Sequence, residues 1–276
     1  MTKRSRYKIA CAGFVTCLVL VMWGFGCGGS VGKNSSAVCT NADSSIVVCR
    51  ATPDCPTGLP GPSLVGVPCA QGGFYCMDST EVTRSQYSKF ATTAPVAAPC
   101  DCGWKVGYAP NAACENDPGV AKQDSHPQAC VDWCDAHGFC AWAGKRLCTG
   151  TWSSKGKDPA QDEWFNACSA GGTKTYCFGS TWDPIACNTA ARSPSNPTTE
   201  PVGSLTTCEG GFPKLFDLTG NVAEWSGACD GVSGIDGKCA VRGGTYAVSD
   251  FEATCASAPP EARDVTSKYF GFRCCY

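Results

Sequence analysis

Cysteine constrains this chain more than any other residue, because 24 of its 276 residues are cysteine. This density is typical of a disulfide framework formed in an oxidising compartment rather than of cytosolic thiols. Structural zinc sites need sets of Cys-x-x-Cys pairs, whereas this chain offers Cys100-x-Cys102 and the adjacent Cys274 and Cys275. We therefore expect disulfides rather than zinc.

Residues 1–27 are typical of an export segment. Four basic residues between positions 3 and 8 precede an apolar run over 9–26. The sequence around Cys27 resembles a lipoprotein processing site, and lipidation of Cys27 would attach the protein to a membrane. An ordinary signal peptide and an uncleaved anchor are the alternatives. We expect an exported protein, either a cell-envelope lipoprotein of the outer membrane or a secreted protein.

Cysteine parity bears on this choice. Removal of Cys11 and Cys17 with a signal peptide leaves 22 cysteines, an even number. Lipidation of Cys27 leaves 21, and an odd set implies one unpaired thiol or an intermolecular bond.

The charge balance argues against a nucleic-acid partner. Beyond the export segment, 24 acidic residues face 18 basic ones, since four of the 22 basic residues lie in that segment. The two histidines are a poor supply for a Ser-His-Asp triad or a histidine-rich metal site.

Composition divides the remainder of the chain into two parts. Residues 28–68 are rich in Gly, Ser, Pro and Thr, and indicate a linker or loop region stapled by Cys39, Cys49, Cys55 and Cys69. Residues 69–276 form one domain of ordinary size.

Regular elements are few, and the pattern indicates an α+β domain with much irregular structure. One helix is expected over 80–90, capped by Ser79 or Thr80, and another begins at Asp132 and ends at Gly144. A third begins at Asp158-Pro159 and continues through Cys168. Strands are expected over 214–218, 240–246 and 270–274.

Four short blocks follow in order along this domain. They are Asp78-Ser-Thr-Glu-Val-Thr83, Cys140-Ala-Trp-Ala-Gly-Lys-Arg-Leu147, Asp217-Leu-Thr-Gly-Asn-Val-Ala-Glu-Trp225, and Arg242-Gly-Gly-Thr-Tyr246 with Gly271-Phe-Arg273. Together they resemble the formylglycine-generating enzyme (sulfatase-modifying factor) family over about residues 60–276. The resemblance implies a single irregular α+β domain of the C-type lectin-like type. It also implies a copper-dependent oxidase that converts a cysteine of a sulfatase to formylglycine.

The resemblance places two copper-binding cysteines two and seven residues after the aromatic residue of the Gly-Gly-Ser-aromatic turn. Counted from Tyr246, these positions hold Val248 and Ala253. Neither side chain can ligate Cu(I), which prefers sulfur. Copper is therefore not expected, and no catalytic residue is assigned.

A second alignment, counted back from Cys255, places the pair at Thr245 and Asp250 and also misses cysteine. The interval 247–254 contains none, so no gap restores the pair. Cys274 and Cys275 are the only substitutes, and we expect at least one of them in a disulfide.

The same resemblance implies two disulfides, Cys140–Cys274 and Cys168–Cys255. It also implies a Ca²⁺ site at Asp217, Gly220, Val222 and Glu224, whose hard oxygen ligands suit that ion. The alternative is a turn in which Glu224 caps backbone amides beside Trp225. A second calcium site near Asn188 and Thr189 is expected to be lost or altered.

The sequence therefore predicts an exported domain without copper oxidase activity that acts as a binding or scaffold module for an unknown protein or glycan. The alternatives are an active formylglycine-generating oxidase and a purely structural envelope protein. The insertion over 148–161 is expected to be a lid or a disulfide loop. Lys145 and Arg146 are expected to be structural, and Asp132 with Asp135 to start a helix rather than form an acid–base pair.

Overall fold

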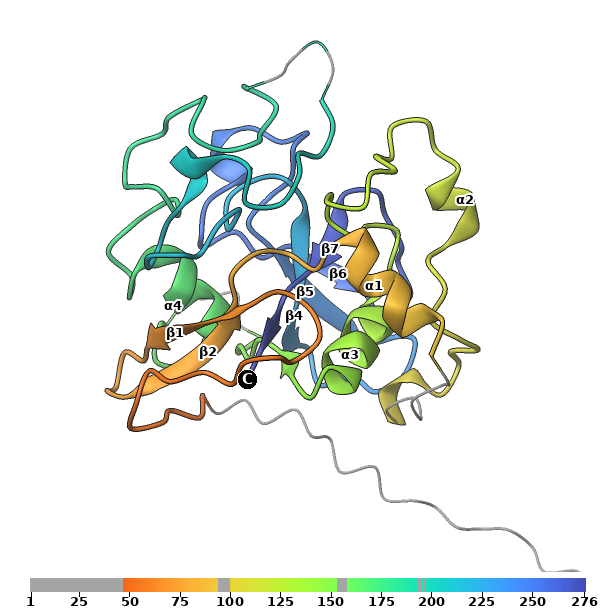
Figure 1. Cartoon of the computed structure of the whole chain (residues 1–276), viewed down its shortest axis with the longest axis horizontal. Helices are drawn as coiled ribbons and strands as arrows, with labels where there is room; N and C mark the ends of the chain where they lie inside the picture. The colour runs from red at the N-terminus through yellow and green to blue at the C-terminus, as the bar shows by residue number, and fades with distance from the viewer. Residues whose placement is uncertain (1–46, 94–99, 153–157, 193–194, 196) are drawn as a thin grey trace, which may run out of the picture. The chain divides into compact units, whose positions relative to one another are not determined.

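Two four-stranded sheets and four α-helices are joined by long irregular segments in the computed structural model, which describes residues 47–93, 100–152, 158–192, 195 and 197–276 (Figure 1). The predicted α+β class is confirmed. The export segment, Cys27 and Cys39 lie outside the described residues. Within the described part of the chain, no helix has the length and apolarity needed to cross a membrane.

The first sheet joins the beginning of the domain to its end. Its antiparallel strands, in spatial order, are β1 (Leu64–Pro68), β2 (Phe74–Asp78), β8 (Cys274–Cys275) and β3 (Arg146–Leu147). β1 lies in the stretch expected to be a linker, so the ordered structure begins earlier than composition indicated. Cys49–Cys69 and Cys55–Cys76 bridges attach the preceding loops to this sheet.

The second sheet carries the candidate site. Its order is β6 (Pro260–Ala262), β5 (Lys238–Arg242), β4 (Ala223–Cys229) and β7 (Phe270–Phe272), with β4 and β7 parallel and the other pairs antiparallel. Trp225 on β4 is 1% exposed, and its indole donates to the Val131 carbonyl at 3.2 Å. β4 therefore lies between β5 and β7 and is tied by Trp225 to the segment before α3.

The helices begin where a side chain caps the first turn. They are α1 (Arg84–Ala91), α2 (Ala112–Glu115), α3 (Trp133–Trp142) and α4 (Glu163–Ser169), with 3₁₀ turns η1 (Cys100–Cys102), η2 (Thr206–Cys208) and η3 (Asp250–Glu252). Asp132 caps α3 as predicted, and forms a reciprocal capping box with Asp135.

Two of the predicted helix starts were wrong. Thr83 rather than Ser79 or Thr80 caps α1, because Thr83 and Gln86 form a capping box. Asp162 rather than Asp158 caps α4, since Asp158 instead accepts from the Ala160 amide in the preceding turn.

The predicted strand over 214–218 does not form. Lys214 and Asp217 have φ values of 69° and 61°, in the left-handed region, which interrupts an extended strand. Only an isolated bridge between Glu209 and Phe216 remains of it.

The adjacent cysteines of β8 connect two parts of the core. Neighbouring side chains on a strand point to opposite faces. Cys274 bonds Cys140 within the cluster that includes Tyr87 and Phe139, and Cys275 bonds Cys148 within the second cluster. The strand is therefore held on both faces, and the 148–161 insertion is attached by disulfide at its first residue.

Nine bridges join the described residues, including Cys168–Cys255 and Cys140–Cys274, the two pairs implied by the family resemblance. The remaining bridges are Cys102–Cys134, Cys114–Cys130, Cys187–Cys208 and Cys229–Cys239. Cys177 is a buried free thiol.

We expect the two bridges of β8 to stabilise the fold non-additively. Each closes a long loop, with sequence separations of 134 and 127, but either alone keeps that loop closed. The two double variants are Cys140→Ala/Cys274→Ala and Cys148→Ala/Cys275→Ala. From loop-closure entropy, removing either bridge first should lower the free energy of unfolding by about 3 kcal/mol, and removing the second by about 5 kcal/mol more. Denaturant unfolding of both double variants and the quadruple variant measures this, and simple additivity would contradict it.

Candidate functional site

The segment after Tyr246 is held against the second sheet by turns and one disulfide. Gly243 and Gly244 adopt φ values of 84° and 73°, which turn the chain after β5. The Tyr246 amide donates to the Asn221 carbonyl at 2.9 Å, and the Val248 amide donates to Thr245. Cys168–Cys255 then fixes the far end of the segment.

The two positions counted from Tyr246 converge in space. A Cβ placed on Gly244 would lie 2.9 Å from Val248 Cγ2 and 3.1 Å from Ala253 Cβ. Both side chains thus face the same point, although five residues separate them. Ala253 is fully buried, and Val248 is partly exposed.

A pocket of about 470 Å³ opens beside this point, between the second sheet and the segment from Gly244 to Glu252. Its walls are mainly apolar, and the two charged residues that line it are acidic. The lining includes Val241, Thr245, Val248, Pro259 and Phe270, together with Glu252 and Glu261. The pocket can therefore accept a group with an apolar body.

An exposed aromatic residue adjoins the pocket lining in the sequence. Phe251 lies on η3, directly before the lining residue Glu252, and is 71% exposed. An exposed aromatic ring offers a large apolar contact area to a ligand or partner.

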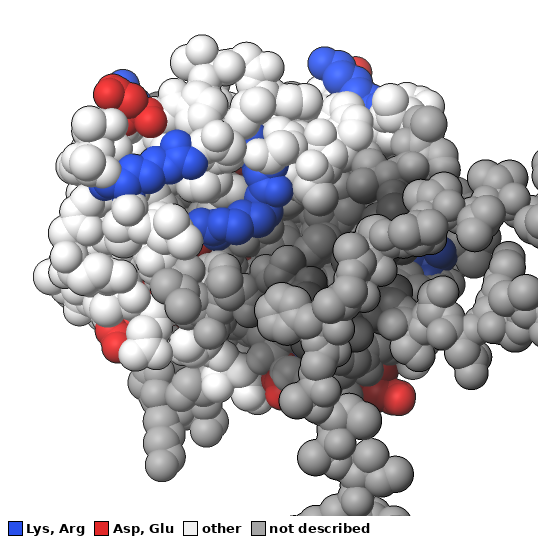
Figure 2. Space-filling view, turned by 90° about the horizontal axis from the view of Figure 1, so that it is seen from below, with Lys and Arg blue, Asp and Glu red and all other residues white. Residues whose placement is uncertain are grey.

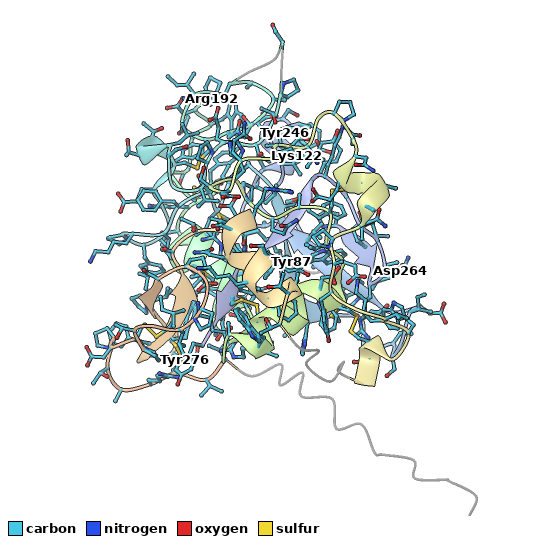
Figure 3. All side chains as sticks on the ribbon, turned by 45° about the vertical axis from the view of Figure 1, so that its right-hand side comes forward. Tyr87, Lys122, Arg192, Tyr246, Asp264 and Tyr276 are labelled. Carbon is cyan, nitrogen blue, oxygen red and sulfur yellow. A yellow bond between two sulfur atoms is a disulfide. The ribbon has the colours of Figure 1, made fainter. Side chains whose placement is uncertain are left out.

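The residues at this point do not fit copper. Val248 and Ala253 have no ligand atom, and the alternative pair Thr245 and Asp250 offers only hard oxygen. Cys274 and Cys275 do not substitute, because both are in disulfides. In the view of Figure 3, Tyr246 lies in the upper part of the molecule and the C-terminal Tyr276 in the lower part.

A second polar cluster surrounds the predicted calcium turn. Glu224, on β4, is fully buried and accepts from Arg273 at 2.7–2.9 Å. It also accepts from the Trp164 indole at 2.7 Å. Asp217 is 4% exposed and accepts from the Gly203 amide at 2.6 Å.

Sequence reasoning missed a third carboxylate in this cluster. Glu81 comes from the segment before α1, is fully buried, and accepts from the Asn221 amide through Oε1 at 2.9 Å. Its Oε2 has no hydrogen-bond partner. Glu81 belongs to the first of the four sequence blocks, but it lies 136 positions before Asp217, so no local signal connected the two.

Electrostatics make this cluster unfavourable for bare carboxylates. Burial raises the pKa of Asp217 to about 6. Burial, followed by the charge of Asp217, raises the pKa of Glu81 well above its ordinary value. Three ionised carboxylates beside Arg273 leave two negative charges that protons or a cation must neutralise.

The donor set fits a hard cation at Asp217 and Glu81 better than at Glu224. The unpartnered Glu81 oxygen and the excess negative charge are what a Ca²⁺ site supplies. Glu224 is already engaged by Arg273 and Trp164, so it has structural partners, but these are side chains rather than the backbone amides of the alternative expectation.

Other candidate residues have structural partners. Lys145 pairs with Asp78 at 2.5 Å with both side chains fully buried, and Arg146 binds Glu163 through two hydrogen bonds. The Asn188 amide donates to Thr198 and Asn221, so at the second calcium position this side chain is used within the fold.

Comparisons with known proteins agree with this geometry. Residues 71–276 match the profile of the "Sulfatase-modifying factor enzyme 1-like domain" family. The mouse "Formylglycine-generating enzyme" is 26% identical over 182 residues, which cover 57% of this chain and 46% of that protein. The bovine "Inactive C-alpha-formylglycine-generating enzyme 2" is 27% identical over 169 residues, covering 56% and 52%. The chain thus spans about half the length of these relatives.

Two solved structures share the fold. PvdO from Pseudomonas aeruginosa superposes with a TM-score of 0.51 at 19% identity, covering 83% of this chain and 90% of that one. CarF superposes with a TM-score of 0.50 at 18% identity, covering 79% and 95%.

Proposed function

The chain belongs to the sulfatase-modifying factor enzyme 1-like domain family, and we propose that it is an exported member without copper oxidase activity that binds a protein or glycan ligand. The observation that carries this proposal is the convergence of Val248 and Ala253 beside Gly244, where no sulfur is available. The frame around that point is kept, and the metal ligands are not.

Two further observations support the absence of oxidase activity and the presence of a binding role. One of the similar proteins bears the word "inactive" in its name. The pocket beside Val248 is open, has apolar walls, and adjoins the exposed Phe251. Such a surface suits the side chain of a protein partner or a sugar ring stacked on the aromatic face.

The face shown in Figure 2 carries both basic and acidic side chains, and uncharged surface covers most of its described part. The pocket itself is lined mainly by apolar side chains, so shape and apolar contact carry the proposed recognition.

Restoring sulfur should restore copper binding. We expect the Val248→Cys/Ala253→Cys variant to bind one Cu(I), because the two positions face the same point. The wild type should bind none in a non-thiol reductant that leaves disulfides intact. A Cu(I) competition titration measures both, in a Cys177→Ala background as control. Tight binding of one Cu(I) by the wild type would overturn the proposal.

The binding role predicts a specific loss. Phe251→Ser should abolish binding to those members of a defined glycan array or peptide library that the wild type binds. Its thermal stability should stay unchanged, because the side chain is exposed. Val48→Ser, at a side chain that is also exposed, is the matched control and should leave binding intact. Equal binding by wild type and Phe251→Ser would place the ligand elsewhere.

We also propose Ca²⁺ in the acidic cluster, at the turn of Asp217, Gly220, Val222 and Glu224 that the sequence predicted. Asp217 and the unpartnered oxygen of Glu81 would bind the ion, while Glu224 stays paired with Arg273. The ion would supply positive charge that the cluster lacks and would stabilise the turn. We expect Ca²⁺ to raise the melting temperature of the chelator-treated wild type, and Asp217→Asn to lose most of this shift. An unchanged melting temperature in the wild type would rule out the ion.

Lipidation of Cys27 is the proposed route to the membrane. The nine bridges use eighteen of the 21 cysteines after Cys27, and Cys177 is unpaired, which leaves Cys39 and Cys100. An odd set with one buried thiol needs no bond from Cys27. Metabolic labelling with a fatty-acid analogue should mark the wild type and not Cys27→Ser; labelling of neither would indicate a plain signal peptide or an uncleaved anchor.

A further inference from the structure

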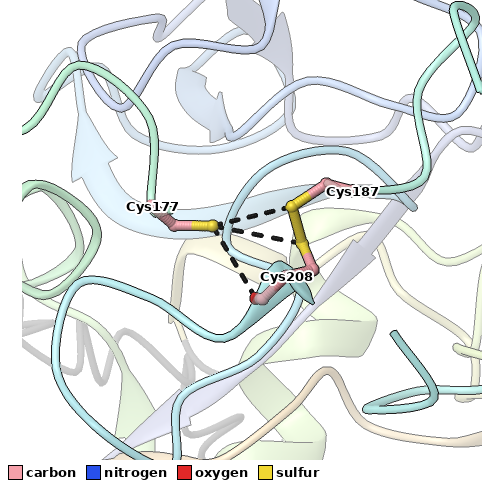
Figure 4. A group of neighbouring side chains, drawn as sticks. All are labelled: Cys177, Cys187 and Cys208. Carbon is pink, nitrogen blue, oxygen red and sulfur yellow. Dashed lines mark hydrogen bonds between the residues drawn. A yellow bond between two sulfur atoms is a disulfide. The ribbon is translucent and has the colours of Figure 1, made fainter. Parts of the chain in front are cut away.

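Three buried cysteine sulfur atoms lie close together, and none of the three residues lines the pocket (Figure 4). Cys177 Sγ lies 3.7 Å from Cys187 Sγ and 4.0 Å from Cys208 Sγ, and the latter two residues form a disulfide. All three residues are at most 1% exposed. Among the described residues, this is the one group of cysteine, histidine and acidic side chains whose ligand atoms gather closely enough for a metal ion.

The thiol is poorly placed to exchange with the disulfide. Thiol–disulfide exchange requires the attacking sulfur to approach in line with the bond that breaks, so it should be about 2 Å farther from the leaving sulfur than from the attacked one. Cys177 Sγ is instead nearly equidistant from both. The thiol therefore lies broadside to the bridge, as one corner of a triangle.

Two of the three sulfur–sulfur distances, those from Cys177 to Cys187 and to Cys208, are close to the distances found around a thiolate-bound metal ion. With metal–sulfur bonds of about 2.3 Å, sulfur atoms around one ion lie about 3.8–4.0 Å apart. The distances from Cys177 to its two neighbours match this range. Opening the Cys187–Cys208 bond would let the third edge lengthen to the same value.

Backbone contacts hold two of the three corners independently of the disulfide. The Cys177 amide donates to Thr219 Oγ1 at 3.2 Å, and its carbonyl accepts from the Gly211 amide at 2.7 Å. The Cys208 amide donates to the Leu205 carbonyl at 2.9 Å. The backbones of Cys177 and Cys208 are thus held by the fold as well as by the bridge.

We propose that Cys177, Cys187 and Cys208 bind one thiophilic divalent cation, such as Zn²⁺ or Cd²⁺, when the Cys187–Cys208 bridge is reduced. A dithiol reductant supplies the electrons: its two thiols become a disulfide while Cys187 and Cys208 become thiols. The cation then binds three thiolates and releases three protons.

Charge selects the divalent ion. Three thiolates and a divalent cation carry a net charge of −1, whereas a monovalent cation leaves −2 in the interior. Burying the smaller net charge of the divalent complex costs less desolvation free energy than burying the larger charge of the monovalent one.

The test is to refold fully reduced chain in a thiol–disulfide buffer with and without Cd²⁺, and then to map bridges without reduction. With Cd²⁺, the wild type should bind one ion with a cadmium–thiolate absorption band, and Cys187 and Cys208 should be recovered as thiols. Without Cd²⁺ the bridge should form. Cys229–Cys239, a bridge with a short separation of 10, should form in both cases and is the internal control.

Cys177→Ala is the matched variant. It should form the Cys187–Cys208 bridge with or without Cd²⁺ and bind the ion at least about tenfold more weakly. Wild type and Cys177→Ala should also be compared as folded proteins treated with limiting dithiol, so that the result does not depend on refolding. Equal cadmium binding by wild type and Cys177→Ala, or a wild-type bridge unaffected by Cd²⁺ in both formats, would overturn the proposal. The proposed binding role at the pocket is unaffected by either outcome.

Discussion

Covalent attachment of the C-terminal strand is the constraint on which the rest of the structure depends. Much of this domain is irregular, and loops supply few of the repeated backbone hydrogen bonds that stabilise helices and sheets. β8 contains two residues, and both are bonded across the core, to Cys140 and Cys148. The Gly271-Phe-Arg273 block that precedes it supplies β7 and the Arg273 partner of Glu224. One short segment therefore joins both sheets, both core clusters and the acidic cluster.

This arrangement is compatible with the proposed loss of the copper ligands, because the surrounding frame does not depend on them. Gly244, Tyr246 and the Cys168–Cys255 bridge set the path of the segment that carries Val248 and Ala253. None of these features requires sulfur at either position. The pocket beside them is thus a product of the frame, and is available for recognition without oxidation chemistry.

Much of the frame was predictable from sequence, because the four blocks preserve spacing that identifies the family and its two shared bridges. The start of α1 was not predictable from sequence, because Ser79, Thr80 and Thr83 can all cap a helix. The choice among them depends on the Val82 amide bonding Phe272 across the core. The left-handed backbone at Lys214 and Asp217 was equally hidden, because neither residue is glycine. Counting from Tyr246 selected Val248 and Ala253, and the structure brings these two side chains together beside Gly244. The pocket, Phe251 and the contribution of Glu81 required coordinates. The contact between Cys177 and the Cys187–Cys208 bridge also required coordinates, because the order of cysteines along the chain does not specify which of them pair.

The central claim is that this family frame is retained without the oxidase centre. The most direct measurement incubates the wild-type protein, its disulfides intact, with Cu(I), oxygen and a Cys-x-Pro-x-Arg peptide, and follows the peptide mass. The account predicts that the cysteine remains unconverted at every time point. Conversion of that cysteine to the formylglycine aldehyde with repeated turnover would contradict it.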